Sequence, residues 1–145
     1  MGLSVTYLLD TNILSEMAKR EPCLAVAQLL QQRQFQCAVG APTIEELSFG
    51  INRLPPSAKR DMLSLWLEEI LNNFVLLPYD HHCGFWLGRE RARLMAIGKT
   101  TPHTDGEIAA IAVVNELTLV TRNTADFQNF SALRIENWFV KSPAS

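Results

Sequence analysis

The chain has 145 residues, and 48% of them are apolar. This length suits one domain with a sizeable core, and so apolar a composition excludes a largely disordered chain. The net charge of −2 argues against a general nucleic-acid coat but allows a nuclease, because an acidic metal site adds negative charge of its own.

Strand and helix patterns alternate in the first half of the chain. Short apolar runs bounded by turn residues indicate buried strands, whereas apolar residues at 3-4-3 steps form one side of a helix. Ile44, Leu47, Ile51 and Leu54 have the helical spacing, and Pro55 ends that helix. In chain order, the expected elements are a strand at 5–9, a helix at 12–19, a helix from Pro22, a strand at 35–39, a helix at 43–54 and a helix at 57–73.

The second half continues the alternation. Asp80 suits the N-cap of a long helix, and Gly98 lies beyond the end of that helix. The expected elements are a strand at 75–77, a helix at 81–97, a buried helix at 105–116, a strand at 117–121, a turn or short helix at 124–130 and a strand at 133–136. This order predicts an α/β fold whose mainly parallel sheet is covered by helices on both faces. We expect one domain over 1–145, with a core at about 5–139 and a short C-terminal tail.

The composition also predicts a cytoplasmic protein. No apolar run reaches the roughly 20 residues that a bilayer requires, and the N-terminus lacks the basic and apolar regions of a secretory signal. Cys23, Cys37 and Cys83 are odd in number and share no metal-like spacing. We therefore expect them to be reduced thiols in the core.

A polar triplet, Asp10-Thr11-Asn12, directly follows the first predicted strand. A carboxylate there lies at the carboxyl end of a strand, which is where α/β folds bind ligands. The alternative role of Asp10 is to cap the next helix by accepting hydrogen bonds from its free amides. The two roles are compatible, because a carboxylate has two oxygens.

Acids recur at the start of a later helix, in Thr43-Ile44-Glu45-Glu46. This pattern also fits a capping box, in which Glu46 reaches back to the cap at Thr43. Helical spacing does not choose between Glu45 and Glu46, because both lie off the centre of the apolar stripe.

Two further acids follow in the second half. Asp105 begins an Ala/Ile/Val-rich helix, where an acid also suits the helix dipole. Nearby Glu107 is either a second ligand or, as we favour, an acid whose charge suits the first turn of the helix. Asp126 lies in a turn after a strand, where Asp often bonds its own backbone.

Several carboxylates at one sheet edge repel each other, and a divalent cation bound between them usually offsets this repulsion. Mg²⁺ and Mn²⁺ prefer oxygen ligands, and such ions generate hydroxide, orient phosphate and stabilise a leaving oxygen. Phosphodiester hydrolysis requires these three functions. The chain has no GxxxxGK[ST], GxGxxG or GxSxG motif, and its histidines lack a zinc pattern.

Five segments carry a family resemblance. They are LLDTNILSE at 8–16, TIEELSFG at 43–50, LLPYD at 76–80, DGEIAA at 105–110 and LVTRNTADF at 119–127. In this order they resemble the motifs of PIN-domain toxins of the VapC type, including the FitB-like branch. The resemblance implies a three-layer α/β/α fold with a central, parallel, five-stranded sheet.

The resemblance also implies a function and partners. It implies a Mg²⁺- or Mn²⁺-dependent endoribonuclease that acts on RNA as the toxin of a toxin–antitoxin pair. The toxin is expected to form a homodimer. A small VapB-like antitoxin is expected to block its site and to bind operator DNA.

When the family's acidic positions are transferred to this sequence, Asp10, Glu46 and Asp105 form the acidic core and bind the metal. The motif match therefore selects Glu46 over Glu45. Asp126 ranks fourth, because some relatives carry an acid at the position of Asn123 instead. Three polar residues, Asn12, Thr121 and Asn123, are given supporting roles. Thr121 orients a water or phosphate, and Asn12 holds Asp10 in place.

Two other functions fit the same residues. One is a PIN-like module that binds RNA or a partner without cutting, with its acids serving as helix caps. The other is a different metal-dependent phosphoesterase.

Basic clusters, such as Lys19-Arg20, are either solvated helix faces or a rim that holds a phosphate backbone.

Overall fold

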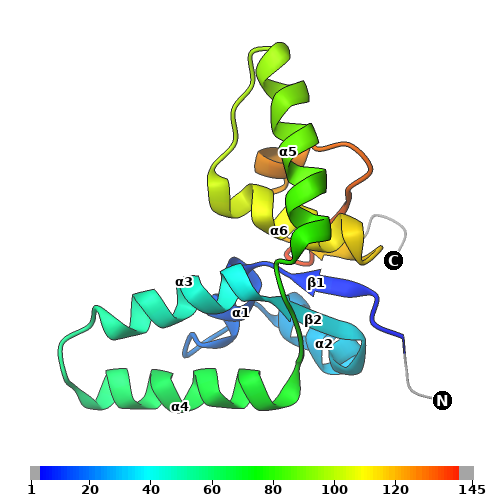
Figure 1. Cartoon of the computed structure of the whole chain (residues 1–145). Helices are drawn as coiled ribbons and strands as arrows, with labels where there is room; N and C mark the ends of the chain where they lie inside the picture. The colour runs from blue at the N-terminus through cyan, green and yellow to red at the C-terminus, as the bar shows by residue number, and fades with distance from the viewer. Residues whose placement is uncertain (1–3, 141–145) are drawn as a thin grey trace.

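The computed structural model describes residues 4–140, which form a central sheet between two layers of helices (Figure 1). In chain order, the elements are β1 (Tyr7–Leu9), α1 (Thr11–Met17), α2 (Leu24–Arg33), the 3₁₀ turn η1 (Gln34–Gln36), β2 (Cys37–Gly40), α3 (Ala41–Asn52), α4 (Ala58–Asn73), β3 (Val75–Leu77), α5 (His81–Ala96), α6 (His103–Val114), β4 (Thr118–Val120), α7 (Thr124–Phe127) and β5 (Arg134–Glu136).

The sheet has five strands in the order β3-β2-β1-β4-β5, and every pairing is parallel. The predicted α/β class and five-stranded parallel sheet are therefore confirmed. In the central strand, Leu8 lies opposite both Ala38 and Leu119. Because β1 is central, the residue that follows it lies in the middle of the carboxyl edge of the sheet.

Alternate strand residues face two separate cores, as the two-residue period of a strand requires. Leu8, Ala38 and Leu119 pack under α5 and α6. On the other face, Leu9 and Val39 pack against α1, α2 and α4. Figure 1 shows α3 and α4 side by side as a hairpin that extends beyond the sheet, while α5 and α6 cover the opposite side.

Two helices begin earlier than the sequence predicts. Helix α3 starts at Ala41, because Gly40 is its N-cap and Pro42 suits its first turn. Thr43 therefore lies inside the helix, and the capping box with Glu46 is wrong. Helix α6 starts at His103 rather than at Asp105.

Strand boundaries differ by one or two residues, and β2 starts at Cys37 because η1 occupies the beginning of the predicted strand at 35–39. Helix α5 has the predicted ends: Asp80 Oδ1 accepts a hydrogen bond from Cys83 N–H (3.1 Å). Beyond its last residue, Gly98 adopts φ of +75°, a conformation that glycine tolerates best.

The cysteine prediction is confirmed for two of the three thiols. Cys37 and Cys83 are buried, whereas Cys23 is half-buried at the start of α2, and all three are free. Burial raises the pKa of Cys37 to about 12, so this thiol is protonated and unreactive. No helix among residues 4–140 is long and apolar enough to cross a membrane. The predicted tail lies largely outside the described residues.

Close packing of α6 on α5 generates a matched pair of glycine predictions. A Cβ at Gly106 would lie 2.9 Å from Cδ1 of the buried Leu87, whereas a Cβ at Gly88 would meet nothing within 4 Å. We expect Gly106→Ala to lower the free energy of unfolding by about 1 kcal/mol, because overpacking outweighs the helix propensity of alanine. Gly88→Ala should raise it by about 0.5–1 kcal/mol. Urea denaturation measures both, and stabilisation by both variants would contradict the close approach.

Candidate active site

Asp10 lies at the centre of the candidate site. It follows β1 directly, caps α1 and is only 6% exposed. Its Oδ1 accepts a hydrogen bond from Thr11 N–H (2.7 Å), and its Oδ2 accepts from Thr121 Oγ1 (2.8 Å) and Asn12 Nδ2 (3.1 Å). Burial raises the pKa of Asp10, while these three hydrogen bonds lower it in part. Both predicted roles of Asp10, helix cap and buried carboxylate at the sheet edge, are therefore compatible with its geometry.

Asn12 and Thr121 support Asp10 and each other. Asn12 Nδ2 donates to Thr121 Oγ1 (3.2 Å), and Asn12 Oδ1 accepts from Arg122 N–H (3.1 Å). The hydroxyl of Thr121, which is fully buried, also accepts from Asn123 N–H (3.0 Å). This network joins the residues after β1 to those after β4 and fixes the orientation of the Asp10 carboxylate.

Glu46 reaches the same cluster from α3. Burial and the negative charge of Asp10 raise the pKa of Glu46, whereas hydrogen bonding to Thr11 lowers it in part. The effect of the Asp10 charge shows that Glu46 lies near Asp10. Spacing alone did not distinguish it from Glu45, because both glutamates lie off the centre of the apolar stripe.

Asp105 is half-buried in the first turn of α6. Burial, followed by the charges of Asp10, Asp126 and Glu46, raises its pKa to about 6. Helices from both layers, α3 and α6, therefore bring carboxylates to the same edge of the sheet.

Asp126 lies in α7, is exposed, and adds to the repulsion on both Asp10 and Asp105. Its backbone N–H donates to Asn123 O (3.1 Å), a bond between main-chain atoms and not the expected contact of the Asp126 carboxylate with its own backbone. Asn123 is the N-cap residue of α7, and its side chain makes no capping hydrogen bond. The sequence-predicted residues thus come together, with Asp126 at the exposed side of the cluster.

Glu107 faces a different set of neighbours. Its Oε2 lies 3.8 Å from His103 Nε2, and its charge adds to burial in raising the pKa of Tyr79. It does not contribute to the shifts of Asp10 or Asp105. The geometry favours the predicted first-turn role of Glu107 over a role as a ligand.

The acidic cluster offers the oxygen donors of a magnesium or manganese site, but protein side chains do not surround a single ion position. Among residues 4–140, no three Asp, Glu, His or Cys side chains lie close enough together to hold an ion. Mg²⁺ is commonly bound by one or two carboxylates together with waters and substrate phosphate, so an open set of oxygen donors fits such an ion. Mutual repulsion among the carboxylates also favours a cation between them.

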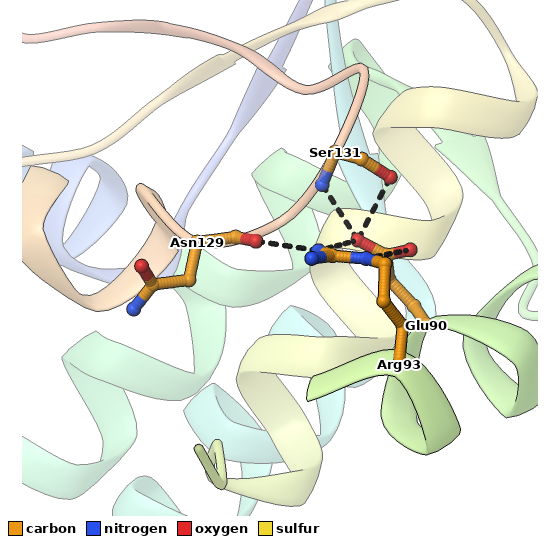
Figure 2. Close-up of polar contacts among 4 residues, drawn as sticks. All are labelled: Glu90, Arg93, Asn129 and Ser131. Carbon is orange, nitrogen blue, oxygen red and sulfur yellow. Dashed lines mark hydrogen bonds and ion pairs between the residues drawn. The ribbon is translucent and has the colours of Figure 1, made fainter. Parts of the chain in front are cut away.

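A second buried carboxylate, which sequence reasoning missed, lies on α5 (Figure 2). Glu90 Oε1 accepts from Arg93 Nη2 (2.6 Å), Ser131 N–H (2.6 Å) and Ser131 Oγ (2.9 Å). Arg93 Nη2 also donates to Asn129 O (2.7 Å). Burial acts to raise the pKa of Glu90, but the hydrogen bonds from Arg93 and Ser131 outweigh it and lower the pKa. These contacts, the Glu90 clamp, tie α5 to the loop that follows α7.

Known proteins resemble the chain over most of its length, although no protein-family model matches it. Ribonuclease VapC2 of Haemophilus influenzae is 31% identical over 132 residues, which are 91% of this chain and 97% of that protein. Toxin FitB of Neisseria gonorrhoeae is 33% identical over 124 residues, which are 83% of this chain and 89% of that protein.

Solved structures show the same fold. The structure of FitAB bound to an IR36 DNA fragment has a TM-score of 0.87 and 27% identity, and covers 97% of this chain and 100% of the matched chain. VapBC2 from Rickettsia felis, bound to a DNA fragment from its promoter, has a TM-score of 0.81 and 26% identity, and covers 92% of this chain and 99% of the matched chain.

Repulsion at Asp105 generates a prediction for the metal-free protein. Because the folded pKa of about 6 exceeds the ordinary 3.8, the folded state binds more protons between these values, and its stability falls as pH rises through them. Asp105→Asn should therefore raise the free energy of unfolding by roughly 1 kcal/mol at pH 7.5, and by less at pH 4. Urea denaturation in chelator measures this difference. The matched variant Glu107→Gln removes an acid outside the carboxylate cluster and should give a smaller gain at pH 7.5. An equal gain from both variants would contradict the assignment.

The Glu90 clamp predicts a loss of stability. Glu90→Gln should lower the free energy of unfolding at pH 7 by about 2 kcal/mol, because Arg93 and Ser131 lose a charged acceptor. Since the folded pKa of Glu90 is lowered, its contribution is present above the ordinary 4.5 and is lost as pH falls through the folded value. Thermal and urea denaturation test this. Glu68→Gln, an exposed acid on α4, serves as the control and should change stability by less than about 0.5 kcal/mol.

Proposed function

The chain belongs to the VapC family of PIN-domain ribonuclease toxins, and we propose that it hydrolyses RNA at the carboxylate cluster around Asp10. One observation carries this proposal. A buried carboxylate at the centre of the sheet edge is held by three hydrogen-bond donors and lies within electrostatic reach of Glu46, Asp105 and Asp126.

We further propose that the activity is that of a Mg²⁺- or Mn²⁺-dependent endoribonuclease. Asp10, Asp105 and Glu46 would hold the metal together with waters and a substrate phosphate, because their oxygens suit hard cations and their charges repel one another without one. When bound, the ion supplies an activated water, orientation of the phosphate and stabilisation of the leaving oxygen.

The chain's own residues supply orientation and proton handling. Thr121 and Asn12 fix the Asp10 carboxylate, so its oxygens meet the substrate without reorganisation. Glu46, which approaches Asp10 from α3, positions the attacking water and accepts a proton from it. The water oxygen bonds to phosphorus in line with the departing 3′ oxygen. That P–O bond breaks, the leaving oxygen takes a proton, and the products carry 5′-phosphate and 3′-hydroxyl ends.

The proposed partners follow from the structural neighbours, which are antitoxin–toxin complexes, some of them bound to DNA. We propose that this chain pairs with a small VapB-like antitoxin and meets operator DNA only through it. A homodimer that acts in the cytoplasm is the corresponding proposal for the toxin itself.

The cluster predicts loss of cleavage when one central charge is removed. Asp10→Asn should lower cleavage of labelled total RNA at least ~100-fold with Mg²⁺ or Mn²⁺, while circular dichroism shows an intact fold. Chelator should abolish wild-type cleavage.

Two neighbouring glutamates provide a matched control within one helix. Glu46→Gln should lose cleavage, whereas Glu45→Gln should retain it, because only Glu46 faces Asp10. Metal-independent RNA binding without cleavage by the wild type would favour the binding-module alternative. Cleavage of DNA or of small phosphoesters in preference to RNA would favour a different phosphoesterase.

A further inference from the structure

Arg122 lies next to the carboxylate cluster. It directly follows Thr121, whose hydroxyl donates to Asp10 Oδ2 (2.8 Å). Its backbone N–H donates to Asn12 Oδ1 (3.1 Å), and the amide of the same Asn12 donates to Asp10 (3.1 Å). The network that orients Asp10 therefore also fixes the backbone of Arg122.

The guanidinium of Arg122 lies over an aromatic ring. Its Cζ is 4.6 Å from the ring centroid of Phe139, a cation–π distance. The residue is exposed, so this stacking leaves the donor edge of the guanidinium open to solvent. A stacked guanidinium loses less side-chain entropy on binding than a free one, because its orientation is already restricted.

The charge of Arg122 has no carboxylate partner within ion-pair distance among residues 4–140. Its positive charge contributes to the lowered pKa of Glu16, yet the main cause of that shift is the hydrogen bond from Lys19, and Lys19 Nζ lies 2.8 Å from Glu16. By contrast, Arg93 pairs with Glu90 (2.6 Å) and Arg33 with Glu136 (3.6 Å). Arg122 is thus a cation without an ion-pair partner among the described residues, and its backbone is held by the network that orients Asp10.

We propose that Arg122 binds a phosphate of the RNA backbone next to the scissile phosphate. The planar guanidinium matches two phosphate oxygens with two parallel hydrogen bonds. A cation at this position also offsets the repulsion between an RNA strand and the acidic cluster. The inference rests on the proposed function, because it names a substrate contact of that same site.

Binding without turnover tests this contact. The background variant Glu46→Gln prevents cleavage without touching Asn12 or Arg122, and a labelled single-stranded RNA oligonucleotide is the probe in fluorescence anisotropy. Adding Arg122→Gln should weaken binding about tenfold and reduce the slope of log affinity against log salt by about 0.7. Arg122→Lys should recover only part of the affinity, because an ammonium lacks the planar fork.

Arg53 is a matched control, since this exposed arginine also lies over a phenylalanine, Phe49, at 5.5 Å. It is the C-cap residue of α3, in the connection between α3 and α4. Arg53→Gln should leave affinity and salt slope unchanged.

Turnover separates substrate binding from a structural role. In the otherwise wild-type protein, Arg122→Gln should raise KM about tenfold, leave kcat within a factor of about three, and leave the Tm unchanged. Four outcomes would each overturn the inference. Arg122→Gln could leave affinity and KM unchanged, or lower the Tm enough to account for the loss. Arg53→Gln could cause an equal loss, or the Arg122-containing protein could fail to bind RNA. If the wild type cleaves RNA and Arg122→Gln keeps its KM, the proposed function stands and this contact alone fails.

Discussion

The burial of one negative charge at the centre of the sheet edge organises the rest of the site. An aspartate that is 6% exposed needs compensation for the water it has lost, and Thr11, Asn12 and Thr121 provide it. Thr121 comes from the end of β4, so the compensation depends on the parallel pairing of β1 with β4. The fold and the ionic state of Asp10 are therefore coupled.

The other carboxylates approach Asp10 from both helical layers. Glu46 arrives on α3, and Asp105 arrives on α6, which packs against α5 through the contact of Gly106 with Leu87. Neither layer alone assembles the cluster. The Glu90 clamp adds a third constraint, because it anchors the chain just after α7, the helix that carries Asp126.

Sequence patterns predicted those parts of the molecule that depend on local chemistry. The strand before Asp10 and the alternation of strands with helices gave the parallel sheet and its polar edge. Glu46 required the family resemblance, because helical spacing leaves both Glu45 and Glu46 off the centre of the apolar stripe. The capping box failed for a separate reason, since Gly40 and Pro42 start α3 before Thr43. Glu90 was missed because it stands in a charged helical run that is typical of a solvated face.

The partner of Glu90 explains why no local pattern reveals it. Ser131 lies 41 residues further along the chain and meets Glu90 only in the folded protein. The same holds for Arg122, whose ring partner Phe139 belongs to a different segment beyond β5. Long-range pairings of this kind follow from tertiary packing and not from periodicity.

The short strands have a consequence for how the sequence can vary. Each strand has three or four residues, so at about 3.3 Å per residue the sheet is only about 10 Å deep. In β1 and β4 the residue that is not at an end, Leu8 or Leu119, is fully buried in a core, whereas Leu76 of the edge strand β3 is 44% exposed. The centre of the sheet therefore tolerates few substitutions, and tolerated substitutions belong mainly on the outer faces of the helices. Mutational robustness in this protein is thus a property of its helical layers.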